Sequence, residues 1–203
     1  MPLIKILQDK NKQIGIWKIL DNEVKLNKND LFNTNYHPNI YTYKNTKRKE
    51  EIIATRKLSK IMFPEYNLSK NIDGKPIFNG SELFVSISNT KNLIAIMAST
   101  ERCGVDIQYK NTNILKLQNK FINKNDFIIN KNIENLMWLW CAKESMYKVF
   151  GVSKINFKNN LIVSYKNGIF TGFCNHSEFH FSCEFDTNII NGYYFINTKN
   201  IQY

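Results

Sequence analysis

The segment from residue 138 to residue 151, WLWCAKESMYKVFG, constrains the fold more than any other stretch of the chain. It contains no proline and no internal glycine, and an apolar and aromatic run leads into three charged residues before Gly151. Nothing in such a sequence interrupts a helix, and glycine is the residue most often found just beyond a helix end. We therefore expect a long helix from about residue 131 to residue 150, with Gly151 as its C-cap.

Helix geometry places three chemically different side chains of this segment in one row. At about 3.6 residues per turn, Trp140, Glu144 and Lys148 share a face, whereas Lys143 is rotated away from them. An aromatic ring, a carboxylate and an ammonium group in this order could pack, coordinate a cation and hold a phosphate. The alternative is an exposed Glu–Lys pair, which contributes only about 0.2–0.5 kcal/mol to helix stability. The helix alone does not decide between the two.

A second segment, CGVDIQY at residues 103–109, has the alternation of a β-strand. Aliphatic residues alternate with Asp106 and Gln108, so these two oxygen-bearing side chains project from one face and the aliphatic pair packs on the other. Together with Glu144 they would form a site made only of oxygen ligands. Magnesium suits such a site because it keeps several waters and usually takes one or two protein carboxylates beside the phosphates of a substrate.

The chain has 203 residues, enough to bury a core in one domain or two small ones, and its 43% of hydrophobic residues is typical of a globular rather than a disordered chain. No apolar run approaches the roughly 20 residues that a membrane-spanning helix needs. The N-terminal apolar patch is also too short for a signal peptide, so we expect a cytoplasmic protein with no membrane partner. The four cysteines lie far apart without a C-x-x-C pair, which indicates reduced, packed thiols.

The formal net charge of +11 favours an acidic partner, which could be nucleic acid, an anionic lipid or an acidic protein. An A+T-rich coding sequence would also produce heavy use of lysine, asparagine and isoleucine, so part of the charge can arise without any function. The densest basic run is only three residues long, at positions 47–49, and the sequence has neither zinc-finger spacings nor the paired aromatic strands of an RNA-recognition fold. Nucleic acid is therefore a minor hypothesis.

The first half of the chain begins with a predicted hairpin at residues 3–8 and 13–20, followed by an Asn-rich loop at residues 21–44. From about residue 46 to residue 62 the pattern becomes helical, and Pro64 ends the helix. The core-facing stripe of this helix is expected at Ile52, Ile53, Arg56, Leu58 and Ile61.

Turn and strand patterns follow this helix. Residues 73–76, Asp-Gly-Lys-Pro, predict a turn by their composition. Residues 83–89 and 92–99 then predict two strands, joined by a tight turn at residues 89–91.

The second half repeats the combination of helices and strands. We expect a helix near residues 113–123 and the long helix described above, followed by a strand-rich meander with Asn-Gly hairpin turns at residues 167–168 and 191–192. The predicted strands of this meander are residues 155–165, 169–174, 178–186 and 190–197. Each half thus pairs helix with antiparallel strands, which predicts an α+β protein with a boundary near residue 101.

The two key segments match the motifs of a known family. The sequence resembles the 4′-phosphopantetheinyl transferases of the surfactin-synthetase type, whose motifs are a GxDx(E/Q)-like strand and a WxxKE(S/A)xxK helix. In this chain the motifs read GVDIQ at residues 104–108 and WCAKESMYK at residues 140–148, in the same order and at a family-like separation. Members also have a G-K-P turn and an S-I-S-H-S-like strand end, which here are GKP at residues 74–76 and SISNT at residues 86–90.

The resemblance implies a fold of two similar α/β halves, each with helices packed on an antiparallel sheet, and an active site between the halves. Residues 1–101 would form the N-terminal half with contacts to the coenzyme A nucleotide, and residues 102–203 the C-terminal half with the magnesium-binding and catalytic motifs. The implied reaction moves the 4′-phosphopantetheine arm of coenzyme A to a serine of an acyl or peptidyl carrier protein and releases adenosine 3′,5′-bisphosphate. Such carriers are small, acidic and helical, and the two-half architecture favours a monomer.

The resemblance also assigns roles to individual residues. Asp106, Gln108 and Glu144 would bind Mg²⁺ together with the pyrophosphate of coenzyme A. Lys148 would contact the phosphate under attack, Glu144 would help to deprotonate the serine, and Lys143 would be structural.

Further contacts to coenzyme A are implied in the N-terminal half. They would come from Lys75 and Ser88 and, near the nucleotide end, from Lys47 and Arg48. An exposed turn or helix start with no ligand is the alternative, and it is about as well supported as function for Lys47 and Arg48. Arg56 also matches the family helix and is expected to be a structural ion-pair partner.

Two residues depart from the family pattern. Gln108 stands where many members have glutamate and offers only a neutral carbonyl oxygen. Asn89 stands where members usually have a histidine that touches a phosphate; asparagine can donate a hydrogen bond but cannot carry charge. These departures leave open a non-catalytic relative that binds coenzyme A or a carrier protein. A more remote alternative is a basic RNA-binding module.

Overall fold

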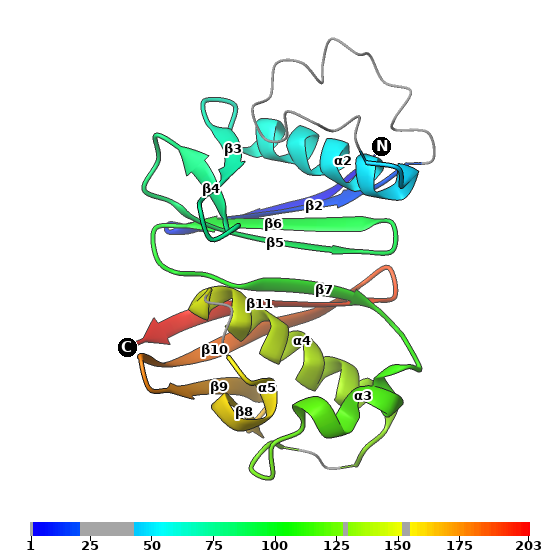
Figure 1. The fold of residues 1–203 in the computed structure, drawn as a ribbon, viewed down its shortest axis with the longest axis vertical. Coiled ribbons are helices and arrows are strands. Elements are labelled where there is room, and N and C mark those ends of the chain that lie inside the picture. Colours follow the sequence, from blue (N-terminus) through cyan, green and yellow to red (C-terminus); the bar gives the residue numbers. More distant parts are fainter. Residues whose placement is uncertain (1, 21–42, 128–129, 152–154) are drawn as a thin grey trace. The chain divides into compact units, whose positions relative to one another are not determined.

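The structure is a computed structural model that describes residues 2–20, 43–127, 130–151 and 155–203. Within these ranges the protein is α+β, with four helices and two antiparallel sheets, which confirms the predicted class. The chain divides into two compact units, Met1–Glu101 and Arg102–Tyr203, each with its own sheet (Figure 1). The loop predicted at residues 21–44 lies almost entirely outside the described residues.

The first unit is built on a six-stranded antiparallel sheet with the strand order β1-β2-β6-β5-β4-β3. The two predicted hairpins are present, but β5 continues to Thr90, so the predicted turn at residues 89–91 is displaced to Lys91 and Asn92. Asn92 has a φ of 63°, a conformation that asparagine tolerates better than most residues. The strands are β1 (Leu3–Gln8), β2 (Lys12–Lys18), β3 (Asn67–Lys70), β4 (Pro76–Asn79), β5 (Phe84–Thr90) and β6 (Leu93–Ser99).

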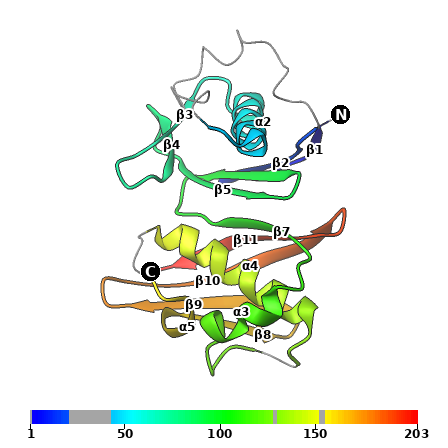
Figure 2. The same cartoon turned by 45° about the vertical axis from the view of Figure 1, so that its right-hand side comes forward.

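Helix α2 (Thr46–Met62) covers one face of this sheet (Figures 1 and 2). The side chain of Asn45 caps its start by accepting a hydrogen bond from the backbone N–H of Arg48. Buried side chains of α2, including Leu58, pack against apolar residues of the sheet. The prediction that Ile61 faces the core is wrong, because Ile61 is 49% exposed. It lies nine positions after Ile52, about two and a half turns, and therefore on the opposite side of the helix.

The second unit is built on a five-stranded antiparallel sheet with the order β7-β11-β10-β9-β8. Its two Asn-Gly hairpin turns are confirmed: Asn167 and Gly168 have φ values of 54° and 81°, and Asn191 and Gly192 have values of 51° and 80°. Positive φ at both central residues is what a type I′ turn requires. The strands are β7 (Val105–Tyr109), β8 (Leu161–Lys166), β9 (Ile169–His176), β10 (Phe179–Ile190) and β11 (Tyr193–Gln202).

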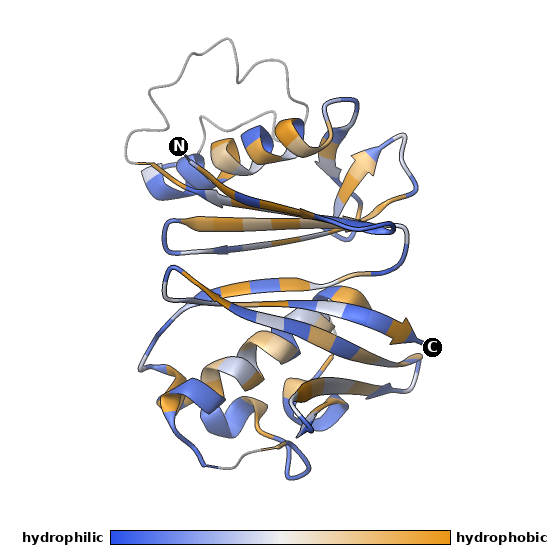
Figure 3. Ribbon diagram, turned by 180° about the vertical axis from the view of Figure 1, so that it is seen from behind, coloured by the Kyte–Doolittle hydropathy of each residue, from blue (hydrophilic) through white to orange (hydrophobic). Residues whose placement is uncertain are grey.

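Helix α4 (Ile133–Phe150) is the long helix expected from the sequence. Asn132 caps its start by accepting a hydrogen bond from the N–H of Asn135, and Gly151 ends it in the left-handed conformation with a φ of 70°. The helix lies against the sheet of its own unit (Figures 1 and 2), and its buried side chains form most of one side of the core. In Figure 3 most turns at the strand ends are hydrophilic, whereas hydrophobic colour is concentrated in the strands and helices.

Two shorter helices complete this unit. Helix α3 (Ile114–Phe121) lies within the predicted range of residues 113–123. Helix α5 (Phe157–Asn160) was not expected, since residues 155–165 predicted a strand. The side chain of Asn156 accepts hydrogen bonds from the N–H groups of Lys158 and Asn159 and so starts a helical turn before β8. No helix in the described ranges is long and apolar enough to cross a membrane.

A glycine of the strand motif controls how closely β7 approaches α4. A Cβ atom on Gly104 would overlap the backbone carbonyl of Ser145 in α4. The N–H of Gly104 also donates to the side chain of Thr198 on β11, at 2.9 Å, and its carbonyl accepts from the N–H of Thr198. The absence of a side chain at this position therefore lets the strand lie directly against the helix.

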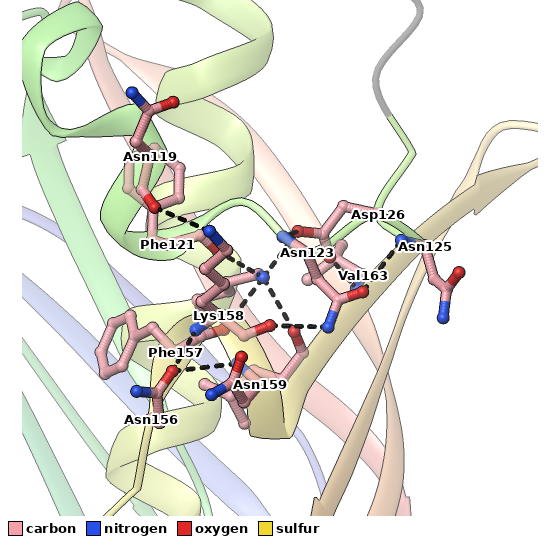
Figure 4. A network of polar contacts seen from close by, with 12 residues as sticks. Asn119, Phe121, Asn123, Asn125, Asp126, Asn156, Phe157, Lys158, Asn159 and Val163 are labelled. Atoms are coloured by element: carbon pink, nitrogen blue, oxygen red, sulfur yellow. Dashed lines mark hydrogen bonds and ion pairs between the residues drawn. The ribbon is translucent and has the colours of Figure 1, made fainter.

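Lys143 holds the helices and loops of the second unit together from the centre of α4. Its side chain is completely buried, and its ammonium group donates to the carboxylate of Asp126 at 2.6 Å. The same ammonium group donates to three backbone carbonyls, those of Phe121, Phe157 and Leu161. The Asp126 carboxylate in turn accepts from the N–H groups of Asn123 and Val163, as Figure 4 shows. These bonds tie the end of α3, the helix α5 and the start of β8 to α4.

We predict that Lys143→Met lowers the free energy of unfolding by about 3–5 kcal/mol, because it leaves the buried Asp126 carboxylate without its positive partner. Urea unfolding followed by circular dichroism measures the loss. As a control, Glu51→Ala breaks the exposed ion pair between Arg48 and Glu51 on α2. Exposed pairs contribute only about 0–1 kcal/mol, so this variant should unfold almost like the wild type. Equal losses in the two variants would contradict the structural role of Lys143.

Candidate functional site

The strand motif and the helix motif meet inside the second unit. The ammonium group of Lys148 on α4 donates to the carboxylate of Asp106 on β7 at 2.8 Å, although the two residues are 42 positions apart in the chain. It also donates to the backbone carbonyl of Val105 at 2.8 Å. Antiparallel pairing of β7 with β11 and the packing of α4 on β7 produce this approach.

Asp106 is a buried carboxylate, with a side chain only 1% exposed. Its carboxylate therefore does not lie on a solvated face of the strand. The amide nitrogen of Gln108 donates to the two oxygens of Asp106 at 3.4 and 3.2 Å, so the two side chains do lie together on one face of β7. Val105 and Ile107 alternate with them and are also buried, as the strand pattern predicted.

Glu144 lies one helical turn before Lys148 and is partly buried. Burial and, to a smaller extent, the nearby charge of Asp106 raise the pKa of Glu144 to about 7, while Lys148 opposes the shift. A carboxyl group with this pKa exchanges its proton near neutral pH, which is what a general base or acid requires. A carboxyl group whose pKa is raised by a neighbouring carboxylate also marks a place where an added cation is stabilised.

Cys141 is a neighbour of this site that the motif comparison gave no role. It lies seven positions before Lys148, about two helical turns, and its thiol is completely buried. Burial is the largest of the causes that raise the pKa of the thiol well above its usual value. The negative charge of Asp106 and a hydrogen bond with its side chain raise the pKa further. The thiol is therefore protonated at neutral pH and unsuited to act as a nucleophile. All four cysteines are free and buried, which confirms the prediction of reduced, packed thiols.

Trp140 contributes to the packing of α4. It does not take part in the polar cluster, which is formed by Asp106, Gln108, Glu144 and Lys148. Its ring contacts Phe121 at a centroid distance of 5.2 Å and Phe157 at 5.5 Å. These are two of the three residues whose backbone carbonyls accept hydrogen bonds from Lys143, so Trp140 helps to enclose the structural ion pair. The row of Trp140, Glu144 and Lys148 that helix geometry predicted is thus divided between core packing and the polar site.

The resemblance implies a magnesium ion at this site, and the side chains present there can be compared with the ligands that magnesium prefers. Within the described residues, no group of three or more histidine, cysteine, aspartate or glutamate side chains could hold a metal ion. Asp106 and Glu144 supply two carboxylates, which is the number that magnesium usually takes from a protein. Gln108 would add an oxygen only if its amide turned over, because its nitrogen now faces Asp106. Asp106 and Glu144 are therefore the two carboxylates that would hold a magnesium ion at this site.

The implied coenzyme A contacts near α2 lie at its exposed first turn. Lys47 and Arg48 are both exposed there. One guanidinium nitrogen of Arg48, Nη1, forms an ion pair with Glu51 at 2.7 Å and already has a partner. Arg56, the expected ion-pair partner further along the helix, is buried.

The other three candidates of the first unit lie in a strand of the sheet or in the turn between two strands. Lys75 follows Gly74 in the turn between β3 and β4, where its backbone N–H donates to the side chain of Asn71 and its carbonyl accepts from the N–H of Asn71. Ser88 and Asn89 are neighbours on β5, and their side chains alternate, so Ser88 is buried and Asn89 exposed. The polar cluster therefore brings together Asp106, Gln108, Glu144 and Lys148, whereas the five candidates of the first unit lie on α2, the β3–β4 turn and β5.

The chain matches no model of a known protein family, and no curated protein is significantly similar to it.

We predict that the free energy of unfolding of the metal-free protein falls as the pH rises from 4.5 to about 7. Glu144 keeps its proton in the folded protein over this range but loses it in the unfolded chain, so the folded state binds more protons. The contribution of Glu144 to stability is therefore fully present below pH 4.5, its pKa in the unfolded chain. This contribution is lost as the pH rises through about 7, its pKa in the folded protein. Chemical unfolding at a series of pH values measures this slope.

The slope should be smaller in Glu144→Gln, because glutamine does not titrate. Glu134→Gln is the matched control, since Glu134 lies exposed in the first turn of the same helix. The control should keep the wild-type slope. An unchanged slope in Glu144→Gln would show that Glu144 has an ordinary pKa.

Proposed function

We propose that the protein is a 4′-phosphopantetheinyl transferase, which moves the phosphopantetheine arm of coenzyme A to a serine of an acyl or peptidyl carrier protein and releases adenosine 3′,5′-bisphosphate. The observation that carries this proposal is the 2.8 Å ion pair between Lys148 and Asp106. It supports the proposal because it joins the GVDIQ strand and the WCAKESMYK helix, the two segments on which the resemblance rests. The two-unit α+β architecture agrees with the fold that the family implies.

Glu144 is the proposed general base. The serine hydroxyl must lose its proton as its oxygen attacks phosphorus, and the carboxylate of Glu144, whose pKa is raised to about 7 in the metal-free protein, is the proposed acceptor of that proton. The partial burial of Glu144 also limits competition from water for the proton. The pKa is raised by burial and by Asp106, so the same two features that define the site prepare the base for its role.

The reaction is a displacement at the phosphorus that carries the pantetheine arm. A bond forms between the serine oxygen and this phosphorus, and the bond to the bridging oxygen of the pyrophosphate breaks, with the electron pair leaving on adenosine bisphosphate. Positioning and charge neutralisation supply most of the catalysis in such reactions. Lys148 neutralises charge on the phosphates, and Asp106 and Glu144 would hold Mg²⁺, which when bound supplies further positive charge to the pyrophosphate.

Five residues of the first unit are proposed to bind the remainder of coenzyme A. The ammonium groups of Lys47 and Lys75 and the guanidinium group of Arg48 suit its phosphates, because coenzyme A carries several negative charges. Ser88 and Asn89 would add neutral hydrogen bonds.

The charge of the protein supports an acidic acceptor. The segment from residue 107 to residue 125, which includes α3, contains four lysines and no acidic residue. All four, Lys110, Lys116, Lys120 and Lys124, are exposed. A basic surface attracts an acidic carrier and raises the rate at which the two proteins meet, an effect that salt weakens.

A non-catalytic relative that binds coenzyme A or a carrier protein is the second candidate. The observation that favours it is the state of Asp106, whose carboxylate is already bound by Lys148 and by the amide of Gln108. A protein that had lost chemistry could keep such a neutralised carboxylate as part of its core. The two candidates differ in one measurable property, the covalent modification of the carrier.

We predict that the protein, incubated with coenzyme A, Mg²⁺ and an apo carrier protein, adds one phosphopantetheine arm to the carrier, seen by mass spectrometry. Glu144→Gln should lower the rate by about 10²–10⁴-fold, the usual contribution of a general base. Asp106→Asn should also lower it, because it removes one charge from the magnesium site. Glu134→Gln should transfer at the wild-type rate. A carrier without any gain in mass would favour the non-catalytic relative.

Gln108→Glu gives a separate prediction. The change replaces an amide donor to Asp106 with a second carboxylate, so the metal-free variant should be less stable than the wild type. The added charge should also lower the magnesium concentration at which transfer reaches half of its maximum. An unchanged magnesium curve would place residue 108 outside the coordination sphere and leave Asp106 and Glu144 as the protein ligands.

A further inference from the structure

We propose that Lys148 is an internal cation that occupies the Asp106 carboxylate until Mg²⁺ displaces it, and that this displacement delivers the lysine to the phosphate of the substrate. The inference rests on the proposed function, since it assigns a regulatory step to the same site. Displacement explains how Lys148 can be bonded to Asp106, a proposed metal ligand, in the structure and can still act on a phosphate.

The contacts of Lys148 are those of a group that is held but can leave. Its ammonium group has two acceptors, the Asp106 carboxylate and the Val105 carbonyl, and its side chain is 20% exposed. Lys143 on the same helix has four acceptors and a side chain with no exposure. Rotation of the Lys148 side chain toward solvent would therefore break only two hydrogen bonds. Rotation of the Lys143 side chain would separate its ammonium group from four acceptors inside the core.

Two cations at the Asp106 carboxylate would repel one another. The carboxylate of Asp106 is almost completely buried, so a magnesium ion bound to it would lie close to the ammonium group in a region that water screens poorly. A dication attracts the carboxylate more strongly than a single positive charge does. Lys148 therefore competes with Mg²⁺ for Asp106, and the metal-free protein keeps its own carboxylate neutralised.

The displaced ammonium group needs a new partner, and the phosphates of coenzyme A provide one. A phosphate that binds Lys148 removes the competitor from Asp106, and a metal ion that binds Asp106 frees Lys148 for the phosphate. The two ligands should therefore strengthen one another's binding by the same factor. This coupling would keep the site closed to the metal until the substrate is present.

The test is the affinity of the protein for Mg²⁺ alone, measured by calorimetry without coenzyme A. Lys148→Met removes the competing charge at similar volume and should bind Mg²⁺ roughly tenfold more tightly or better, the size of effect that one charge nearby has on a carboxylate. Lys148→Arg keeps the charge and should bind like the wild type. Magnesium should also raise the melting temperature of Lys148→Met by more than that of the wild type, because tighter binding stabilises the folded state more.

A measurement on the wild type keeps the inference testable if Lys148→Met does not fold. The side-chain ammonium signal of Lys148 in NMR, identified by its loss in Lys148→Arg, should shift as Mg²⁺ is added. The Lys143 signal is the internal control and should not move, because its ion pair with Asp126 is separate from the site.

The outcomes separate this inference from the proposed function. Equal magnesium affinity in the wild type and Lys148→Met, or a Lys148 signal that stays in place while Mg²⁺ binds, would overturn the competition and leave the transferase proposal intact. If neither protein binds Mg²⁺ at any concentration, the magnesium site itself fails, and the competition fails with it.

Discussion

The buried ion pair between Lys143 and Asp126 is the interaction on which the second unit depends. A lysine with no exposure is costly unless its charge is matched and its N–H groups are bonded, and here a carboxylate and three backbone carbonyls meet both needs. Those carbonyls come from α3, α5 and β8, so the pair fixes the position of three elements relative to α4. Because α4 also carries Glu144 and Lys148, the geometry of the polar site follows from this structural pair.

The two lysines of the helix motif show how position decides the role of a side chain. Lys143 and Lys148 are five residues apart, about 140° around the helix, so one enters the core beside α3 and the other meets β7. The first is completely enclosed, and the second keeps contact with solvent. Only the second can exchange one partner for another, which is why the proposed chemistry and the proposed competition with magnesium both use Lys148.

Much of the fold was predictable because local patterns determine it. The unbroken run of residues 138–150 and the glycine after it predicted α4, and the two Asn-Gly pairs predicted hairpin turns that the structure confirms. The failures were also local. The side chain of Asn156 starts a helical turn where aliphatic residues indicated a strand, and Ile61 is exposed because apolar character alone does not give the direction of a side chain on a helix.

The sequence by itself determined which residues share a face: Asp106 with Gln108 on the strand, and Glu144 with Lys148 on the helix. Only the tertiary structure decided that Asp106 is buried, that Lys148 binds it and that the amide nitrogen of Gln108 faces it. These contacts join residues on elements far apart in the chain, and they depend on how closely β7 can approach α4. That approach is permitted by the missing side chain of Gly104, a packing condition that becomes visible only when strand and helix lie together.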